Sequence, residues 1–167
     1  SIMYAEVTDV RRGQSGTPGE LHGTFQTERD MGALFANTDS GVFGVLTDKA
    51  LAQAQSMEVA TRDQVQTGPA SILSNIAGDQ VESYAVEITH IYPESAGETR
   101  NMMIHVTDQR LLEATGGIIQ GMSGSPLIQN GRIVGAVTHV LISDPSQGYA
   151  ILAENMLETA EQALPPD

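Results

Sequence analysis

The sequence has no cysteine and no tryptophan among its 167 residues. It has only 8 lysines and arginines in total, compared with 21 aspartates and glutamates. Without cysteine, disulfide bonds and thiolate metal sites are excluded. The formal net charge of −13 is repelled by phosphate backbones and anionic membranes, so nucleic-acid binding is not expected. No apolar run approaches the roughly 20 residues of a membrane-spanning helix, so we expect no membrane contact from this segment.

What the chain does contain is enough apolar sequence for a core. Apolar residues make up 40% and charged residues 17%, values typical of a folded domain. This length suits one domain or two small packed lobes. The sequence begins at Ser1 with no initiator methionine and with a predicted strand already under way, so we expect it to be part of a longer chain.

The many glycines and prolines, 17 and 7, divide the chain into short segments and favour strands over helices. The segment 49–55 is either a helical turn or a loop. The dipeptide Asn130-Gly131 is the clearest hairpin signal, because a type I′ turn needs two residues that tolerate positive φ. Strands are predicted over residues 1–10, 20–25, 31–36, 42–46, 70–76, 81–92, 102–106, 126–129 and 132–141.

Two helices are predicted. The first covers 107–114, with Thr107 or Asp108 as N-cap and Gly116 as its stop. The second covers 153–164 and ends at a pair of prolines. Together these elements predict a mostly β domain, a barrel or a sandwich, closed by a C-terminal helix.

Glycines crowd around Met122-Ser123 in the segment 116–126. They permit a tight loop whose backbone N–H groups converge, so the loop could present a hydroxyl and also form an oxyanion hole. An ordinary Gly-Ser turn is the alternative. The pattern Gly-x-Ser-Gly-x-Pro, followed by an apolar hairpin, resembles the second barrel of chymotrypsin-like serine proteases.

That resemblance implies a role for each of several residues. Ser123, rather than Ser125, becomes the nucleophile. The N–H groups of Gly121 and Ser123 form the oxyanion hole. Thr138 and His139, on the return strand, contact the substrate.

A longer match points to one family. The chain resembles the SpoIVB family of sporulation serine peptidases. The similar segments are 107–115, the Ser123 loop, 135–140, 144–149 and the earlier pieces 16–20, 37–44 and 68–73. The resemblance implies a chymotrypsin-like double β-barrel that is incomplete at its N-terminus. Residues 1–66 would then be the remainder of the first barrel, 67–152 the second barrel, and 153–164 the C-terminal helix.

The family's catalytic groups are only partly represented. An Asp fifteen residues before the Ser is implicated in activity, and Asp108 holds that position. It could orient an imidazole, cap the helix, or do both. The family's catalytic His lies in a Gly-His segment upstream of the strand that matches 4–10. We therefore expect the base to precede residue 1 and this chain to be inactive or weakly active alone.

The four histidines of the chain are assigned other roles. We expect His22 to be a surface strand residue, His90 a half-buried strand residue, His105 structural and His139 a substrate contact. Their spacing shows no metal signature, and neither a metal nor a cofactor is expected.

The resemblance implies a self-processing endopeptidase that cleaves a membrane-associated regulator in sporulation signalling. It also implies an extracytoplasmic location between the forespore membranes, in a membrane-anchored parent protein. The alternative function is a peptide-binding module of protease fold that does not cut. A third interpretation is a generic β-barrel domain with an incidental Gly-Ser loop. In that case the long match to the SpoIVB family would be a coincidence. An incomplete first barrel would expose a sheet edge, which predicts a homodimer or strand exchange.

Overall fold

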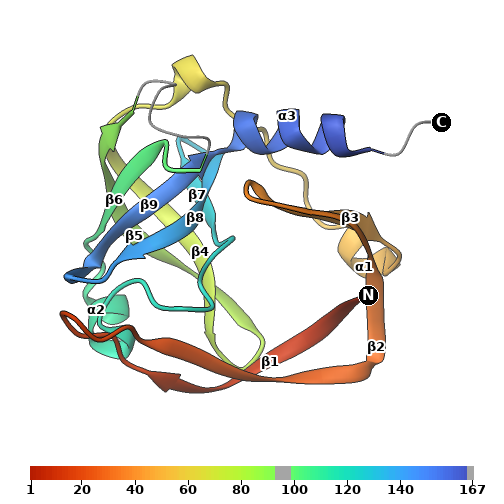
Figure 1. Cartoon of the computed structure of the whole chain (residues 1–167), viewed down its shortest axis with the longest axis horizontal. Coiled ribbons are helices and arrows are strands. Elements are labelled where there is room, and N and C mark those ends of the chain that lie inside the picture. Colours follow the sequence, from red (N-terminus) through yellow and green to blue (C-terminus); the bar gives the residue numbers. More distant parts are fainter. Residues whose placement is uncertain (93–98, 165–167) are drawn as a thin grey trace.

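The computed structural model describes residues 1–92 and 99–164 (Figure 1). Its centre is a closed antiparallel barrel of six strands in the order β4-β5-β6-β9-β8-β7. A separate three-stranded sheet, β1-β2-β3, lies beside it. The prediction of a mostly β fold with a short helix before the Ser123 loop and a C-terminal helix is confirmed.

The barrel strands are β4 (Gly68–Ala77), β5 (Gln80–Ile91), β6 (Met102–Val106), β7 (Pro126–Gln129), β8 (Arg132–Leu141) and β9 (Asp144–Leu152). Their inward side chains form the core, in which Ile72, Ile88, Met102, Ile104 and Leu127 are fully buried. Strand β9 is absent from the sequence prediction. It contains a proline and a glycine, and it is held in place by pairing with both β6 and β8.

The second sheet contains β1 (Ile2–Arg11), β2 (Glu20–Thr38) and β3 (Gly41–Leu46). The prediction of two short strands over 20–25 and 31–36 is wrong, because β2 is continuous. At the two ends of the polar stretch between them, Gln26 pairs with Tyr4 and Asp30 with Met3 of β1, and residues 27–29 form an irregularity in the register. Strand β2 bends midway, so its first part runs with β1 beneath the barrel and its second part turns away with β3 (Figure 1).

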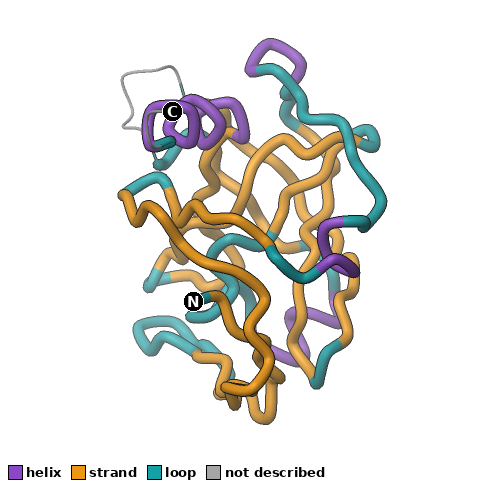
Figure 2. The backbone as a smooth tube through the Cα atoms, turned by 90° about the vertical axis from the view of Figure 1, so that its right-hand side faces the viewer, coloured by secondary structure: helices purple, strands orange, loops and turns teal. Residues whose placement is uncertain are grey.

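Backbone contacts join this sheet to the barrel. Val7 exchanges two hydrogen bonds of 2.9 Å with Gly78, in the turn between β4 and β5. At the start of β2, the Leu21 N–H donates to the Gln120 carbonyl at 2.8 Å. The second view shows the path of the sheet in front of the barrel strands (Figure 2). The three-stranded sheet therefore meets the barrel at the loop that leads to Ser123.

One face assignment in β5 is wrong. An uninterrupted period of two along β5 would place His90, expected to be half-buried, on the face of Tyr84, Val86 and Ile88. The last three are buried, whereas His90 is exposed and not half-buried. A register shift between Ile88 and His90 against β6 interrupts the period of two, so beyond it His90 faces the outer surface while Ile91 packs against the core.

The helices are short: α1 (Lys49–Ala52), the 3₁₀ turn η1 (Arg62–Gln64), α2 (Gln109–Thr115) and α3 (Ala153–Ala163). The undecided segment 49–55 thus begins with a helical turn, capped by the Asp48 side chain. In α3 only Ala153 is buried, and Leu157 is half exposed. Among the residues described, no helix is long and apolar enough to cross a membrane.

The Asn130-Gly131 turn has the predicted geometry, with φ of 52° and 73°. A Gly131→Ala substitution meets no atom within 4 Å, so its cost is conformational only. We expect a loss of about 1 kcal/mol, which corresponds to a fall in Tm of about 2–4 °C. Thermal unfolding followed by circular dichroism measures this change. An Asn130→Gly control should leave Tm within about 2 °C, and a fall larger than that of Gly131→Ala would contradict the turn assignment.

Candidate active site

The loop between α2 and β7 is fixed at its base and exposed at its tip. Met122 is fully buried, while Ser123 beside it is exposed. Gly124 donates its N–H to the Val137 carbonyl at 2.8 Å, and Val137 donates back to Ser125 at 3.0 Å. The buried methionine and the paired backbone hold Ser123 at the barrel surface next to β8.

The two candidate hydroxyls face different partners. The Ser123 Oγ donates to the Thr138 carbonyl on β8 at 3.2 Å and lies at the surface. The Ser125 Oγ donates to the Ser74 Oγ on β4 at 3.3 Å in a half-buried position. Of the two residues, Ser123 is the more exposed to an external peptide carbonyl.

Glycine is required at the position where an oxyanion hole is predicted. Gly121 has a φ of 100°, and a Cβ there would lie 3.0 Å from the Leu21 Cβ of β2. Within the described residues, neither the Gly121 nor the Ser123 N–H donates to a protein acceptor. Two backbone donors are therefore available within two residues of the Ser123 hydroxyl.

None of the four histidines, all of them described, forms a hydrogen bond with Ser123. His22 lies in β2 with its Nε2 3.6 Å from Glu20. His105 pairs across β6 and β9 with Gln147. His139 follows Thr138 directly and is largely exposed, and its pKa is lowered first by the partial desolvation of its ring and then by the nearby Arg100.

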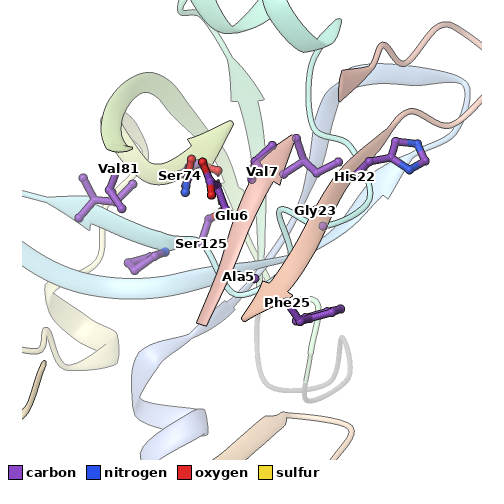
Figure 3. A pocket seen from close by; sticks show the side chains of 14 residues that line it. Ala5, Glu6, Val7, His22, Gly23, Phe25, Ser74, Val81 and Ser125 are labelled. Atoms are coloured by element: carbon purple, nitrogen blue, oxygen red, sulfur yellow. Dashed lines mark hydrogen bonds between the residues drawn. The ribbon is translucent and has the colours of Figure 1, made fainter. Parts of the chain in front are cut away.

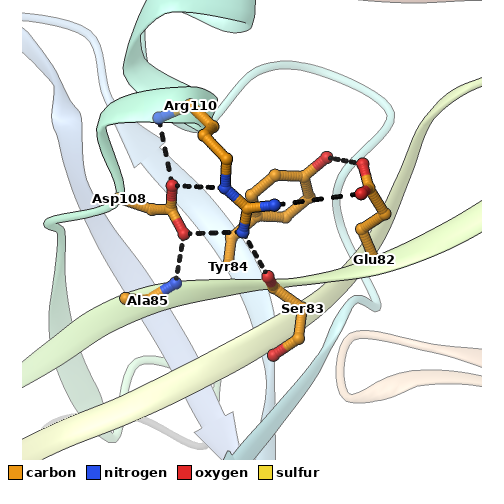
Figure 4. A network of polar contacts seen from close by, with 6 residues as sticks. All are labelled: Glu82, Ser83, Tyr84, Ala85, Asp108 and Arg110. Atoms are coloured by element: carbon orange, nitrogen blue, oxygen red, sulfur yellow. Dashed lines mark hydrogen bonds and ion pairs between the residues drawn. The ribbon is translucent and has the colours of Figure 1, made fainter.

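Asp108 is the N-cap of α2, one of the two roles left open by the sequence (Figure 4). Its carboxylate accepts hydrogen bonds from the N–H groups of Ala85 and Arg110, both at 3.0 Å. It also accepts from the Arg110 guanidinium, at 3.0 Å from Nη2. These bonds, that of the guanidinium first, lower the pKa of Asp108 to about 2 although burial opposes them.

The guanidinium of Arg110 extends this network over β5 (Figure 4). It donates to the Ser83 carbonyl at 2.9 Å and lies 5.1 Å from the Tyr84 ring centroid. Burial, followed by a hydrogen bond to Glu82, raises the pKa of Tyr84 to about 12. The network fastens α2 to β5, and none of the described contacts of Asp108 is to an imidazole.

A cavity of about 540 Å³ lies beside Ser125, where β1 and β2 meet the barrel strand β4 (Figure 3). Glu6 and Val7 from β1, Leu21 from β2, Ser74 from β4 and Ser125 contribute to its lining. These residues come from segments far apart in the sequence, and of the five only Ser125 lies in the Gly-x-Ser-Gly-x-Pro pattern. No group of three metal-ligating side chains occurs in the part of the chain that the structure describes.

The sequence model of the SpoIVB peptidase S55 family matches residues 1–157. The chain belongs to this family. A comparison with curated proteins gave no match.

Solved structures share the fold of this SpoIVB peptidase family member. The active form of the Rv3671c protease from M. tuberculosis superposes with a TM-score of 0.59 at 17% identity, over 89% of this chain and 65% of that one. The inactive form gives 0.57 at 15% identity, over 95% and 87%. The HtrA-type protease AlgW with a decapeptide gives 0.53 at 15% identity, over 87% and 43%. The fold is thus that of chymotrypsin-like proteases, and this chain spans about two thirds of the first of these relatives.

Proposed function

We propose that this chain is a serine endopeptidase domain of the SpoIVB type with Ser123 as its nucleophile. The observation that carries the proposal is the loop itself. An exposed hydroxyl stands beside two backbone N–H groups without a described protein acceptor, on a barrel of protease fold. The family match supports the same assignment.

The chemistry assigned to the site is acyl transfer. The Ser123 Oγ attacks a peptide carbonyl carbon while an imidazole takes its proton. The N–H groups of Gly121 and Ser123 donate to the oxyanion that forms. The intermediate expels the amine, which receives the proton from the imidazolium, and water then hydrolyses the acyl-enzyme. Family resemblance assigns the imidazole to a segment upstream of β1, and Asp108 orients it or acts through the position of α2.

Family resemblance supports the biological part of the proposal. The peptidase would process itself and cleave a membrane-associated regulator in sporulation signalling, at an extracytoplasmic site. Thr138 and His139 would contact the substrate. The exposed Val42 and Val45 of β3 support association with a second chain, as a homodimer or by strand exchange.

A second candidate function is peptide binding without cleavage. It is favoured by the absence of any hydrogen bond between Ser123 and the described histidines, together with the bond from Ser123 to the Thr138 carbonyl. A serine without an adjacent base is a weak nucleophile. Both functions use the same surface, so a measurement of serine reactivity separates them.

The test is covalent labelling with a fluorophosphonate, followed by peptide mapping with tandem mass spectrometry. We expect an adduct on Ser123, and we expect added imidazole to accelerate labelling because it supplies the base. Ser125→Ala should be labelled as the wild type is, whereas Ser123→Ala should not be labelled. If Ser123 stays unmodified with and without imidazole, the peptidase proposal fails and the binding function is left.

A further inference from the structure

The outer surface of the barrel beside Ser123 carries a row of side chains that crosses four strands. His90 on β5 pairs with Met103 on β6, Met103 pairs with Tyr149 on β9, and Tyr149 pairs with His139 on β8. Residues in register across neighbouring strands share one face of the sheet. The neighbours Met102 and Ile104 are in the core, so this row faces outward.

Aromatic rings and one arginine complete this surface. His90 and Tyr92 stack with ring centroids 6.2 Å apart, and Tyr92 lies 6.4 Å from Tyr149. The Arg100 guanidinium lies 5.3 Å from the Tyr149 ring centroid. We call the surface formed by His90, Tyr92, Arg100, Met103, His139 and Tyr149 the β8 platform.

Arg100 differs from several other arginines of this acidic chain. Arg11, Arg110 and Arg132 form ion pairs with carboxylates 3.0–3.8 Å away. No described residue forms an ion pair with Arg100, which is exposed. In a chain of net charge −13, the platform thus presents a cation whose charge no described carboxylate neutralises.

The platform is connected to the nucleophile by direct contacts. The Ser123 Oγ donates to the Thr138 carbonyl at 3.2 Å, and the Thr138 Oγ1 donates to the Thr99 carbonyl at 3.0 Å. Thr99 and Thr138 each immediately precede a platform residue, Arg100 and His139. A peptide held at Ser123 in an extended conformation along β8 would cross the platform within a few residues of the reacting bond.

We propose that the β8 platform selects substrates with an acidic side chain, Asp or Glu, close to the cleaved bond. The Arg100 guanidinium is the partner of the carboxylate, and the His139 ring is a second donor. This proposal rests on the proposed function in that the peptide is taken to lie at Ser123.

The physical basis is the geometry of the guanidinium. Its planar fork matches a carboxylate with two parallel hydrogen bonds, and stacking on Tyr149 restricts its orientation before binding. Because burial and Arg100 lower the pKa of His139, its ring is neutral near pH 7 and donates a single N–H. A Lys or Arg side chain of a peptide would instead meet repulsion from Arg100.

The test measures binding, so it does not depend on turnover. Fluorescent capped hexapeptides of alanine and valine carry one Glu or its isostere Gln at successive positions, and the Ser123→Ala chain is titrated into them by anisotropy. We expect one position at which Glu binds about three- to tenfold more tightly than Gln, the range of a partly exposed charged pair. Arg100→Gln should reduce that ratio to about one. Arg132→Gln is the matched control, because this arginine is the first residue of β8, at the opposite end of that strand from His139, and pairs with Glu58.

Equal affinity for Glu and Gln peptides at every position would overturn the proposal, as would a Glu preference that survives Arg100→Gln. Absence of binding for all peptides at millimolar concentration would also overturn it. The fluorophosphonate experiment reports separately on the proposed function. A chain that labels at Ser123 but shows no Glu preference remains a peptidase without this selectivity.

Discussion

A Gly117→Ala variant is expected to lose about 2–6 kcal/mol in its free energy of unfolding. Gly117 has a φ of 129°, and an added Cβ would lie 2.1 Å from the Pro145 carbonyl oxygen. The unusual backbone costs about 1–3 kcal/mol for an alanine, and the overlap adds about 1–3 kcal/mol. The overlap cannot relax easily, because the same carbonyl accepts the Ile118 N–H at 2.7 Å. Urea unfolding followed by circular dichroism measures the loss.

Gly124→Ala is the matched control for that variant. Gly124 also has a positive φ, 88°, but an added Cβ there meets no atom within 4 Å. We expect it to cost only about 1–2 kcal/mol, the backbone part of the penalty. Equal losses for the two variants would mean that the approach of Gly117 to β9 does not determine the stability of this loop.

Features set by neighbouring residues were predictable from the sequence. The Asn130-Gly131 turn, the N-cap of α2 at Asp108 and its stop at Gly116 are all observed, with Gly116 at a φ of 77°. Each depends on the backbone preference or hydrogen bonding of a few adjacent residues. The glycine loop around Ser123 is also a feature of a few adjacent residues. For that reason a resemblance in sequence could distinguish Ser123 from Ser125 as the predicted nucleophile.

Features set by strand pairing were not predictable in this way. Strand β9 forms although it contains Pro145 and Gly148, because β6 and β8 supply partners on both sides. His90 faces outward because of a register shift against β6, and no pattern in the neighbouring sequence indicates that shift. The cavity beside Ser125 and the β8 platform combine residues from segments far apart in the chain. These two sites can therefore be recognised only when the strand register of the barrel is known.

Asp108→Asn is expected to lower the free energy of unfolding by about 2 kcal/mol at pH 7. The amide still caps α2, but it loses the charge that pairs with Arg110. The folded-state pKa of Asp108 is about 2, below the ordinary value of 3.8. A shift of this size corresponds to about 2.5 kcal/mol, which solvent around the exposed Arg110 reduces.

The sign of the shift fixes the pH dependence. Because the folded-state pKa of Asp108 is lowered, its charge stabilises the fold fully above about pH 4. This contribution is lost as the pH falls through about 2. The stability difference between wild type and Asp108→Asn should therefore shrink between pH 4 and pH 2, measured as urea midpoints at each pH. A difference that stays constant over this range would contradict the assigned ion pair.

Arg110→Gln separates the two roles of Asp108, because it removes the same ion pair and leaves the carboxylate in place. We expect it to destabilise the chain by a similar amount and the double variant to lose little more, since both single changes break one interaction. The rate of fluorophosphonate labelling at Ser123, measured with imidazole present, then assigns the role. A slower rate in Asp108→Asn alone identifies a carboxylate that acts on the imidazole. A slower rate in both variants identifies a carboxylate that acts by holding α2, and with it the loop of Ser123, against β5.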